Sequence, residues 1–307
     1  MLRFIIKRLL VTIPTILVVI TITWGLIKLA PGNFYSGEKK LPPTIEENIR
    51  QKYGLDKPWY QQYGKMLWHI VGHLDFGTSL KYEGQSVNAI IARSLPVSAT
   101  IGLLAYGLAL VVGITAGAIA ALKQNSKWDY ASMTLAMLGI SVPNFVLGPI
   151  LVLIFSLSLY WLPPSRWDGF FSRNIILPVL TLSALYIAYI ARLTRAGMLE
   201  VLRSDYIRTA RSKGLSEKDV VIKHALRGGL MPVVSYTGPA LAFLLTGTVV
   251  VERIFALPGL GNYFIQASLN RDEPLIIGIV AFIAITLLLM NLLVDIAYAF
   301  LDPRVRY

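Results

Sequence analysis

The chain has 307 residues, of which 55% are hydrophobic and 15% are charged, and it contains no cysteine, which excludes disulfides and thiolate metal sites. Its mean hydropathy of +0.61 is too high for a typical soluble domain, so the composition predicts an integral membrane protein. The net charge of +12 lies in the segments between apolar runs, where lysine and arginine orient a membrane chain, and we therefore expect no nucleic-acid partner.

Six apolar segments are long enough to cross a bilayer, which takes about 20 helical residues. They are Leu9–Ile27, Leu95–Leu122, Trp128–Leu162, Ile175–Ala191, Val233–Val251 and Leu275–Phe300. The first could instead belong to a cleaved signal peptide, but its apolar run is long for one and no A-x-A-like cleavage site follows it. We therefore predict an all-α integral membrane protein with six transmembrane helices, the first of them a retained anchor.

The distribution of basic residues sets the orientation of these helices. If the N-terminus is cytoplasmic, the inside segments together hold 16 lysines and arginines, whereas the two short outside loops hold 4. Basic residues collect in the short cytoplasmic loops of membrane proteins, so we expect both termini to lie inside the cell.

The segment 31–93, between the first two predicted helices, is amphipathic and mixed in charge. Pro58 and several glycines divide it into short pieces, so it is too small to form an independent catalytic domain. We expect it to form an external cap over the helix bundle.

The third apolar segment, Trp128–Leu162, is interrupted by proline and glycine. As one straight helix it would be about 50 Å long, which exceeds the hydrocarbon core. Proline removes a helical hydrogen-bond donor, and in lipid the freed backbone groups need other protein or a wet cavity. Pro143 and Asn144 are therefore candidates for a substrate pathway, although a proline kink packed against a neighbouring helix is an equal alternative.

Tyr189 and Tyr236, in or near the fourth and fifth segments, are further candidates for a polar pathway. Tyrosine more often lies in the interfacial belt or forms hydrogen bonds within a bundle. Both interpretations stay open from the sequence.

A charged segment, DYIRTARSKGLSEKDVVIKHALRGGLMP, lies between the fourth and fifth apolar segments. Its pattern predicts a helix over 199–212 that ends at Lys213 and Gly214, where glycine accepts a left-handed conformation. Ser216 followed by Asp219 predicts the start of a second helix. The apolar residues of these helices need a cover, which is either the groove of a soluble partner or a surface of anionic lipid.

The sequence shows no catalytic or metal-binding constellation. His69 and His73 could share a helix face, but no cysteine and no H-E-x-x-H glutamate accompany them, so we expect structural histidines. A phosphate-binding G-x-x-x-x-G-K-[ST] loop and a G-x-S-x-G elbow are both absent. We therefore expect the chain to carry no ATPase or other catalytic site and to bind no metal or cofactor itself.

Several stretches occur in the same order as in one transporter family. They are MLRFIIKRLLVTIPT at the start, QYGK and DFGTS in the external segment, AALKQNSKWDY, MLEVLRSDYIRTARSKGL, LPGLGNYF and the final DPRVRY. The charged segment resembles the EAA-type coupling loop of ABC importer membrane subunits, in the form used by peptide and nickel permeases. Over its whole length the chain is similar to the B-type permease subunits of bacterial oligopeptide importers.

The resemblance implies a type I ABC importer fold. Its parts would be an anchor helix (1–30), a periplasmic segment (31–93), a transmembrane domain (94–300) with a coupling loop (192–232) and a cytoplasmic tail (301–307). The implied protein is a multi-pass subunit of the bacterial inner membrane that imports oligopeptides by alternating access. The implied partners are a second homologous permease subunit, two cytoplasmic ATPase subunits that use ATP and Mg, a periplasmic peptide-binding protein, the oligopeptide substrate and membrane lipid.

The resemblance also implies two contact surfaces. The residues expected at the ATPases are Asp205, Tyr206, Arg208, Thr209, Ala210, Lys213, Gly214, Leu215, Ser216 and His224. The residues expected at the binding protein are Leu257, Pro258, Gly259, Gly261 and Asn262. Arg208-Thr209-Ala210 stands where the general motif has acid–Ala–Ala, so no ion pair of that acid carries over to this chain.

Other functions stay open. A dipeptide, nickel or antimicrobial-peptide permease of the same family is one alternative. An ion-driven secondary transporter, from a different class, needs buried ionisable residues or broken helices at matching points of two repeats, and only one strongly broken segment is evident. A non-transporting membrane scaffold is a further alternative.

Overall fold

The computed structural model describes residues 2–30, 54–164, 166–170 and 172–301, together with isolated positions between 44 and 51. Much of the first half of the predicted cap, and nearly all of the predicted tail, lie outside the described residues.

The described residues form a helical bundle. The helices that are long and apolar enough to span a membrane are α1 (Leu2–Leu29), α4 (Val87–Leu122), α7 (Ile176–Leu202), α11 with α12 (Met231–Leu245 and Val249–Ile254) and α14 (Glu273–Leu301). A bent pair, α5 (Lys127–Ser141) and α6 (Asn144–Leu151) with its π-helical continuation Val152–Ser158, is the sixth span if it crosses as one. The shorter helices are α3 (Trp59–His73), α8 (Asp205–Ser212), α9 (Glu217–Asp219), α10 (Leu226–Gly229) and α13 (Leu260–Asn270). The predicted all-α membrane fold is confirmed.

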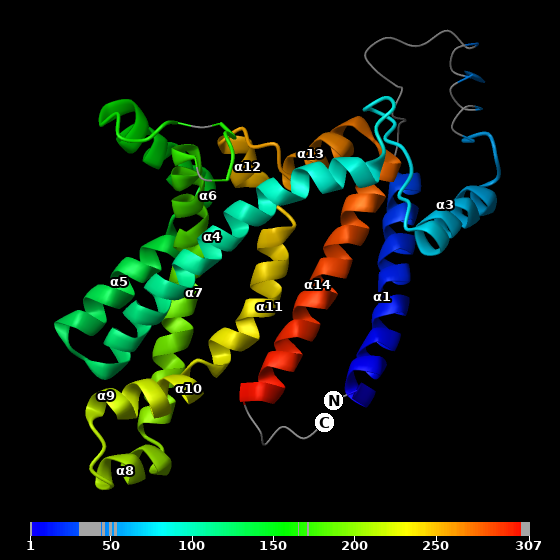
Figure 1. The fold of residues 1–307 in the computed structure, drawn as a ribbon. Helices are drawn as coiled ribbons and strands as arrows, with labels where there is room; N and C mark the ends of the chain where they lie inside the picture. The colour runs from blue at the N-terminus through cyan, green and yellow to red at the C-terminus, as the bar shows by residue number, and fades with distance from the viewer. Residues whose placement is uncertain are drawn as a thin grey trace.

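Figure 1 shows α1, α14 and α11 side by side, with the start of α1 and the end of α14 at the same end of the bundle. Apolar side chains of α4, α7 and α11 form the largest buried cluster, which includes Ala105, Ile190 and Leu244. A Cβ atom on Gly113 of α4 would lie 2.8 Å from the Ile190 side chain, so only glycine lets α4 approach α7 this closely.

The third predicted span is broken rather than straight. Helix α5 ends at Ser141, and α6 begins after Pro143, which holds an extended backbone with φ −60° and ψ 145°. The chain bends by 103° between the two helical arms. The predicted interruption is thus confirmed. The segment does not form one helix of about 50 Å, because the ring of Pro143 disfavours a continuous helix and the chain bends there.

Three predicted helix boundaries differ from the structure. Helix α4 begins at Val87, before the predicted start at Leu95, because the Ser86 hydroxyl accepts a hydrogen bond from the Ala89 N–H and caps the helix there. Helix α7 continues past Ala191 to Leu202, about 16 Å beyond the predicted span at 1.5 Å per residue. Helix α11 ends at Leu245, before a break at Gly247.

Helix α3 is the main element in the described part of the predicted cap. It lies beside α1 in Figure 1, and Ile70 packs with Ile20 of α1 and Ile277 of α14. This helix therefore covers the flank of the bundle, whereas the sequence predicted a cap over it.

Candidate functional site

The loop that joins α7 to α11, residues 203–230, projects as a compact unit. Figure 1 shows α8, α9 and α10 together at the end of the bundle where α1 begins. The prediction of one helix over 199–212 is wrong, because α7 ends at Leu202 and α8 begins at Asp205. Between them the Ser204 hydroxyl donates a 2.6 Å hydrogen bond to the Val201 carbonyl, and Ser204 takes an extended backbone that redirects the chain.

The α7–α11 loop has a small apolar core of its own. Ile207 and Ala210 of α8 meet Val220 and Ala225 of the second helical arm. The same cluster includes Ala121 and Met198, from the ends of α4 and α7. The sequence prediction that these apolar residues need an external cover is therefore wrong for most of them. Full burial of a side chain such as Ile207 stabilises the fold by about 1.5–3 kcal/mol, so this core makes the loop one body.

The turn between the two arms has the predicted chemistry. Gly214 has φ +78°, in the left-handed region that favours glycine. The Ser216 hydroxyl accepts a 3.2 Å hydrogen bond from the Asp219 N–H, which confirms the predicted helix start. A hydrogen bond from Lys223, with a second from Ser216, lowers the pKa of the Asp219 carboxyl below its usual value.

The outer surface of the loop carries most of the residues predicted for ATPase contact. Asp205, Tyr206, Arg208, Thr209, Lys213, Gly214, Leu215 and Ser216 are exposed, and His224 is half-buried. Ala210 is part of the buried core and offers no surface to a partner. Ile222, which the sequence did not single out, is exposed beside this set as a large apolar side chain.

Glycines fix the base of the loop. A Cβ atom on Gly197 of α7 would collide with the Gly229 carbonyl, and one on Gly229 would lie 2.9 Å from the Met198 sulfur. These two glycines let α10 lie directly against α7. The sequence shows two adjacent glycines after Arg227, but it does not show that α10 packs so closely against α7 that glycine is required there.

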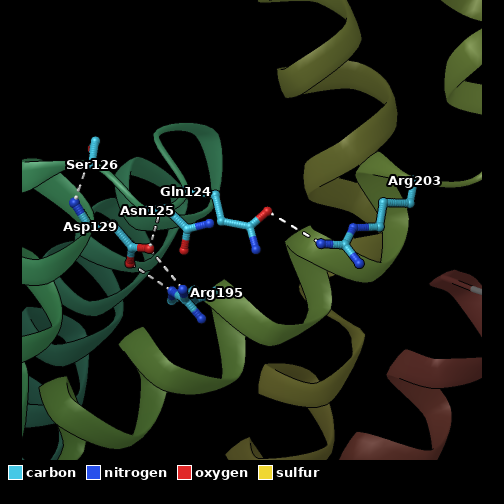
Figure 2. A network of polar contacts seen from close by, with 6 residues as sticks. All are labelled: Gln124, Asn125, Ser126, Asp129, Arg195 and Arg203. Carbon is cyan, nitrogen blue, oxygen red and sulfur yellow. Dashed lines mark hydrogen bonds and ion pairs between the residues drawn. The ribbon is translucent and has the colours of Figure 1, made fainter.

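An ion pair joins the same part of α7 to the first turn of α5, next to the connection from α4 (Figure 2). Arg195 donates two hydrogen bonds to the carboxylate of Asp129, of 2.7 and 2.8 Å. The Asn125 N–H donates a third, of 2.9 Å. About two helical turns further on, at the end of α7, Arg203 donates to Gln124 at 3.3 Å. The position of α7 at the base of the loop is therefore coupled to α4 and α5.

The two predicted pathway tyrosines lie together. The rings of Tyr189 and Tyr236 are stacked at 5.7 Å between centroids, and Tyr186 lies 6.4 Å from Tyr236. Tyr106 lies 6.2 Å from Tyr186 and shares a 2.8 Å hydrogen bond with Thr237. These side chains form a tyrosine cluster at the contact of α4, α7 and α11. Pro143 and Asn144 lie elsewhere, at the bend between α5 and α6.

The predicted binding-protein turn is built around the buried carboxylate of Glu252. The Ser98 hydroxyl and the Asn262 N–H donate hydrogen bonds of 2.7 and 2.9 Å to the two oxygens of this carboxylate. Leu257, Gly259 and Gly261 are buried around it, while Pro258 is exposed and Asn262 is half-buried. Contact with a binding protein therefore remains a prediction for Pro258 and Asn262 alone.

The described residues contain no group of three or more metal-ligating side chains. His69 lies 3.9 Å from the Asp75 carboxylate, and its ring is 6.0 Å from that of His73.

Comparison with known proteins agrees with this architecture. The family model described as "Binding-protein-dependent transport system inner membrane component" matches residues 113–307, and the model for the N-terminal part of such membrane components matches residues 1–102. The chain is 47% identical to the oligopeptide transport system permease protein OppB of Haemophilus influenzae and to that of Escherichia coli, over the full length of each protein. It is 43% identical to the dipeptide transport system permease protein DppB of Bacillus subtilis, over 100% of this chain and 98% of that one.

A solved structure also shares the fold. An inward-facing conformation of the MetNI methionine ABC transporter matches 69% of this chain and 96% of its own with a TM-score of 0.58 and 15% sequence identity. This likeness concerns the fold alone, and it confirms the predicted importer-type arrangement of helices. Because the two family models cover nearly the whole sequence and relatives are 47% identical over its full length, the chain belongs to the family of inner membrane components of binding-protein-dependent transport systems.

Proposed function

We propose that this chain is the permease subunit of an ATP-driven importer that moves oligopeptides from the periplasm to the cytoplasm by alternating access. Relatives that are 47% identical over the full length are oligopeptide permease proteins. The observation that carries the mechanism is the α7–α11 loop, a body with its own core that presents the exposed apolar side chains Tyr206, Leu215 and Ile222. The loop then lies in the cytoplasm, together with both termini, as the distribution of basic residues favours.

The loop suits a protein groove better than a lipid surface. Three of its basic side chains are already paired within it, as Arg208 with Asp205, Arg211 with Glu217 and Lys223 with Asp219. Pairing weakens the attraction of these cations to anionic lipid. The exposed Tyr206 and Leu215 instead give α8 and its turn an apolar contact for the groove of an ATPase subunit.

The rigidity of the loop is what transport requires. To shift a two-state bundle from 1:99 to 99:1, the partners must bind one state about 5.5 kcal/mol more tightly than the other. If the loop unfolded, the conformational entropy of the chain would offset this difference in binding free energy. The core around Ile207 and Val220 prevents this, because it keeps the two arms together. The Asp129–Arg195 pair then passes the displacement of α7 to α4 and α5.

A complete importer needs further subunits under this proposal. A second homologous permease subunit forms the other half of the pathway, and two ATPase subunits bind and hydrolyse ATP with Mg. This chain itself performs no catalysis. A periplasmic peptide-binding protein delivers the oligopeptide and contacts Pro258 and Asn262. Tyr189 and Tyr236, and more distantly Pro143 and Asn144, contribute polar groups to the pathway.

Purification and uptake test the proposal together. The tagged chain should co-purify with a second permease subunit and two ATPase subunits, and proteoliposomes with the binding protein should accumulate labelled tri- to pentapeptides only when ATP is present. Competition by unlabelled dipeptides or by Ni²⁺ tests the alternatives within the family. Uptake that follows an ion gradient without ATP would overturn the proposal in favour of a secondary transporter.

A further inference from the structure

Helix α3 has three different faces. Tyr63, Met66 and Ile70 point toward α1 and α14, where Ile70 joins a buried cluster with Ile20 and Ile277. A polar face lines a cavity of about 360 Å³; its side chains include Gln61, Lys65 and His69. The third face is apolar but uncovered: Tyr60, Trp68 and Val71 are 58, 68 and 62% exposed. At 100° per residue these three side chains lie on one stripe of the helix, between the other two faces.

The contacts of α3 fix its depth relative to the spanning helices. Lys28 of α1 and Glu273 of α14 form an ion pair of 2.9 Å, which marks the polar level at this end of the bundle. The Tyr63 hydroxyl is 2.6 Å from that of Thr21, seven residues before Lys28. Ile70 packs with Ile277, four residues after Glu273. At 1.5 Å per residue, these contacts lie about 6–11 Å below the polar level, at the depth where interfacial helices place their apolar face.

The surroundings of the stripe are apolar as well. Only 6% of the apolar window of α1 is buried, and its exposed side chains include Ile22 and Leu26. Trp24 of α1 lies 5.2 Å from Tyr63 and 6.4 Å from Trp59, so aromatic rings join the two helices near their polar ends. Tryptophan and tyrosine with flanking lysine are the residues that membrane interfaces favour.

We propose that α3 is a membrane-embedded amphipathic helix, whose stripe of Tyr60, Trp68 and Val71 lies among the lipids of the leaflet at the C-terminal end of α1. The polar face then turns toward the cavity, which Lys65 and His69 line. This placement goes beyond the transport function, because it depends only on the chain spanning a bilayer. It makes α3 a lipid contact that holds the outer half of α1 against α14.

Spin labels on introduced cysteines test this placement, because the chain has no cysteine of its own. Trp68→Cys and Lys65→Cys, three residues apart on α3, would each be labelled with a nitroxide in the complete complex in lipid nanodiscs. Oxygen concentrates in lipid, whereas a neutral nickel chelate stays in water. We expect collisions with oxygen to exceed those with the chelate several-fold at position 68 and at position 71, which points about 120° away from position 65, where we expect the order to reverse.

Two results would overturn the proposal. Dominant collisions with the nickel chelate at position 68 would place the stripe in water. Low collisions with both reagents at position 68 would show that protein covers the stripe, for instance a second membrane subunit. Val71→Cys provides the same measurement with every tryptophan retained, so the test still decides if the Trp68→Cys complex does not assemble. The unsubstituted complex, treated with the same label, gives the background from cysteines in partner subunits.

Discussion

Arg195 holds the carboxylate of Asp129 through two hydrogen bonds, although 66 residues separate them along the chain. The pair is bidentate, and the Asp129 side chain is almost fully buried. It joins the first turn of α5 to the stretch of α7 from which the α7–α11 loop departs.

Removal of this pair should destabilise the protein. Loss of one member of a buried ion pair costs about 3–5 kcal/mol, and the partial exposure of Arg195 lowers the expectation for Asp129→Asn to about 2 kcal/mol. Thermal unfolding of the purified complex measures the change. The matched control is Arg203→Gln, which removes only the exposed bond to Gln124 and should change stability by less than about 0.5 kcal/mol. Equal effects of the two variants would contradict the anchoring role of the pair.

The turn at Gly214 should tolerate asparagine but not valine. Nothing lies within 4 Å of a Cβ atom there, so the cost of a side chain comes from its φ of +78° and not from crowding. A left-handed residue costs about 1–2 kcal/mol for most L-amino acids, and less for asparagine. In proteoliposomes, Gly214→Val should keep ATP hydrolysis but lose much of the uptake, while Gly214→Asn should keep both. Normal uptake by an assembled Gly214→Val complex would show that the turn geometry is unimportant.

Two glycine-to-alanine substitutions should change stability in opposite directions. A Cβ atom on Gly197 would collide with the Gly229 carbonyl, and we expect Gly197→Ala to cost about 1–3 kcal/mol through overpacking. Gly107 in α4 has nothing within 4 Å, so Gly107→Ala should gain up to about 1 kcal/mol from helix propensity. The unfolding midpoints of the two complexes check this, and an unchanged or raised midpoint for Gly197→Ala would exclude the close approach of α10 to α7.

Two substitutions in the turn around Glu252 should distinguish a residue that stabilises the turn from a residue that contacts the binding protein. A Cβ atom on Gly259 would collide with the Glu252 carboxyl, so Gly259→Ala should lower the unfolding midpoint. Pro258 is exposed, and Pro258→Ala should leave the midpoint nearly unchanged but weaken stimulation of ATP hydrolysis by the binding protein. Titration of the reconstituted complex with the binding protein measures this, and unchanged stimulation would remove Pro258 from the contact surface.

Local signals in the sequence predicted the local features of the fold. Hydropathy located the spans, Pro143 marked the break between α5 and α6, and Gly214 with Ser216 marked the turn and the helix start. Each of these features depends on residues close together in the chain, where backbone preferences act.

The features that the sequence did not predict depend on tertiary contacts. Ser204 followed by Asp205 is the one local sign of the break after Leu202, and the packing of Ile207 with Met198 completes it through tertiary contact. The Asp129–Arg195 pair and the contact of Gly197 with Gly229 join distant positions, and composition alone does not pair them. The depth of α3 beside α1 likewise follows from contacts such as that of Tyr63 with Thr21.

A crosslink from the tip of the loop tests the central claim most directly. In the chain, which lacks cysteine, Leu215→Cys places one thiol on the exposed turn, and Ala210→Cys places one in the buried core of the same loop. With a short thiol-reactive photocrosslinker in native membranes, we expect Leu215→Cys to capture a nucleotide-hydrolysing subunit and Ala210→Cys to capture none. If Leu215→Cys reacts fully with the crosslinker in an active complex but captures no such subunit, the loop does not couple this protein to ATP hydrolysis.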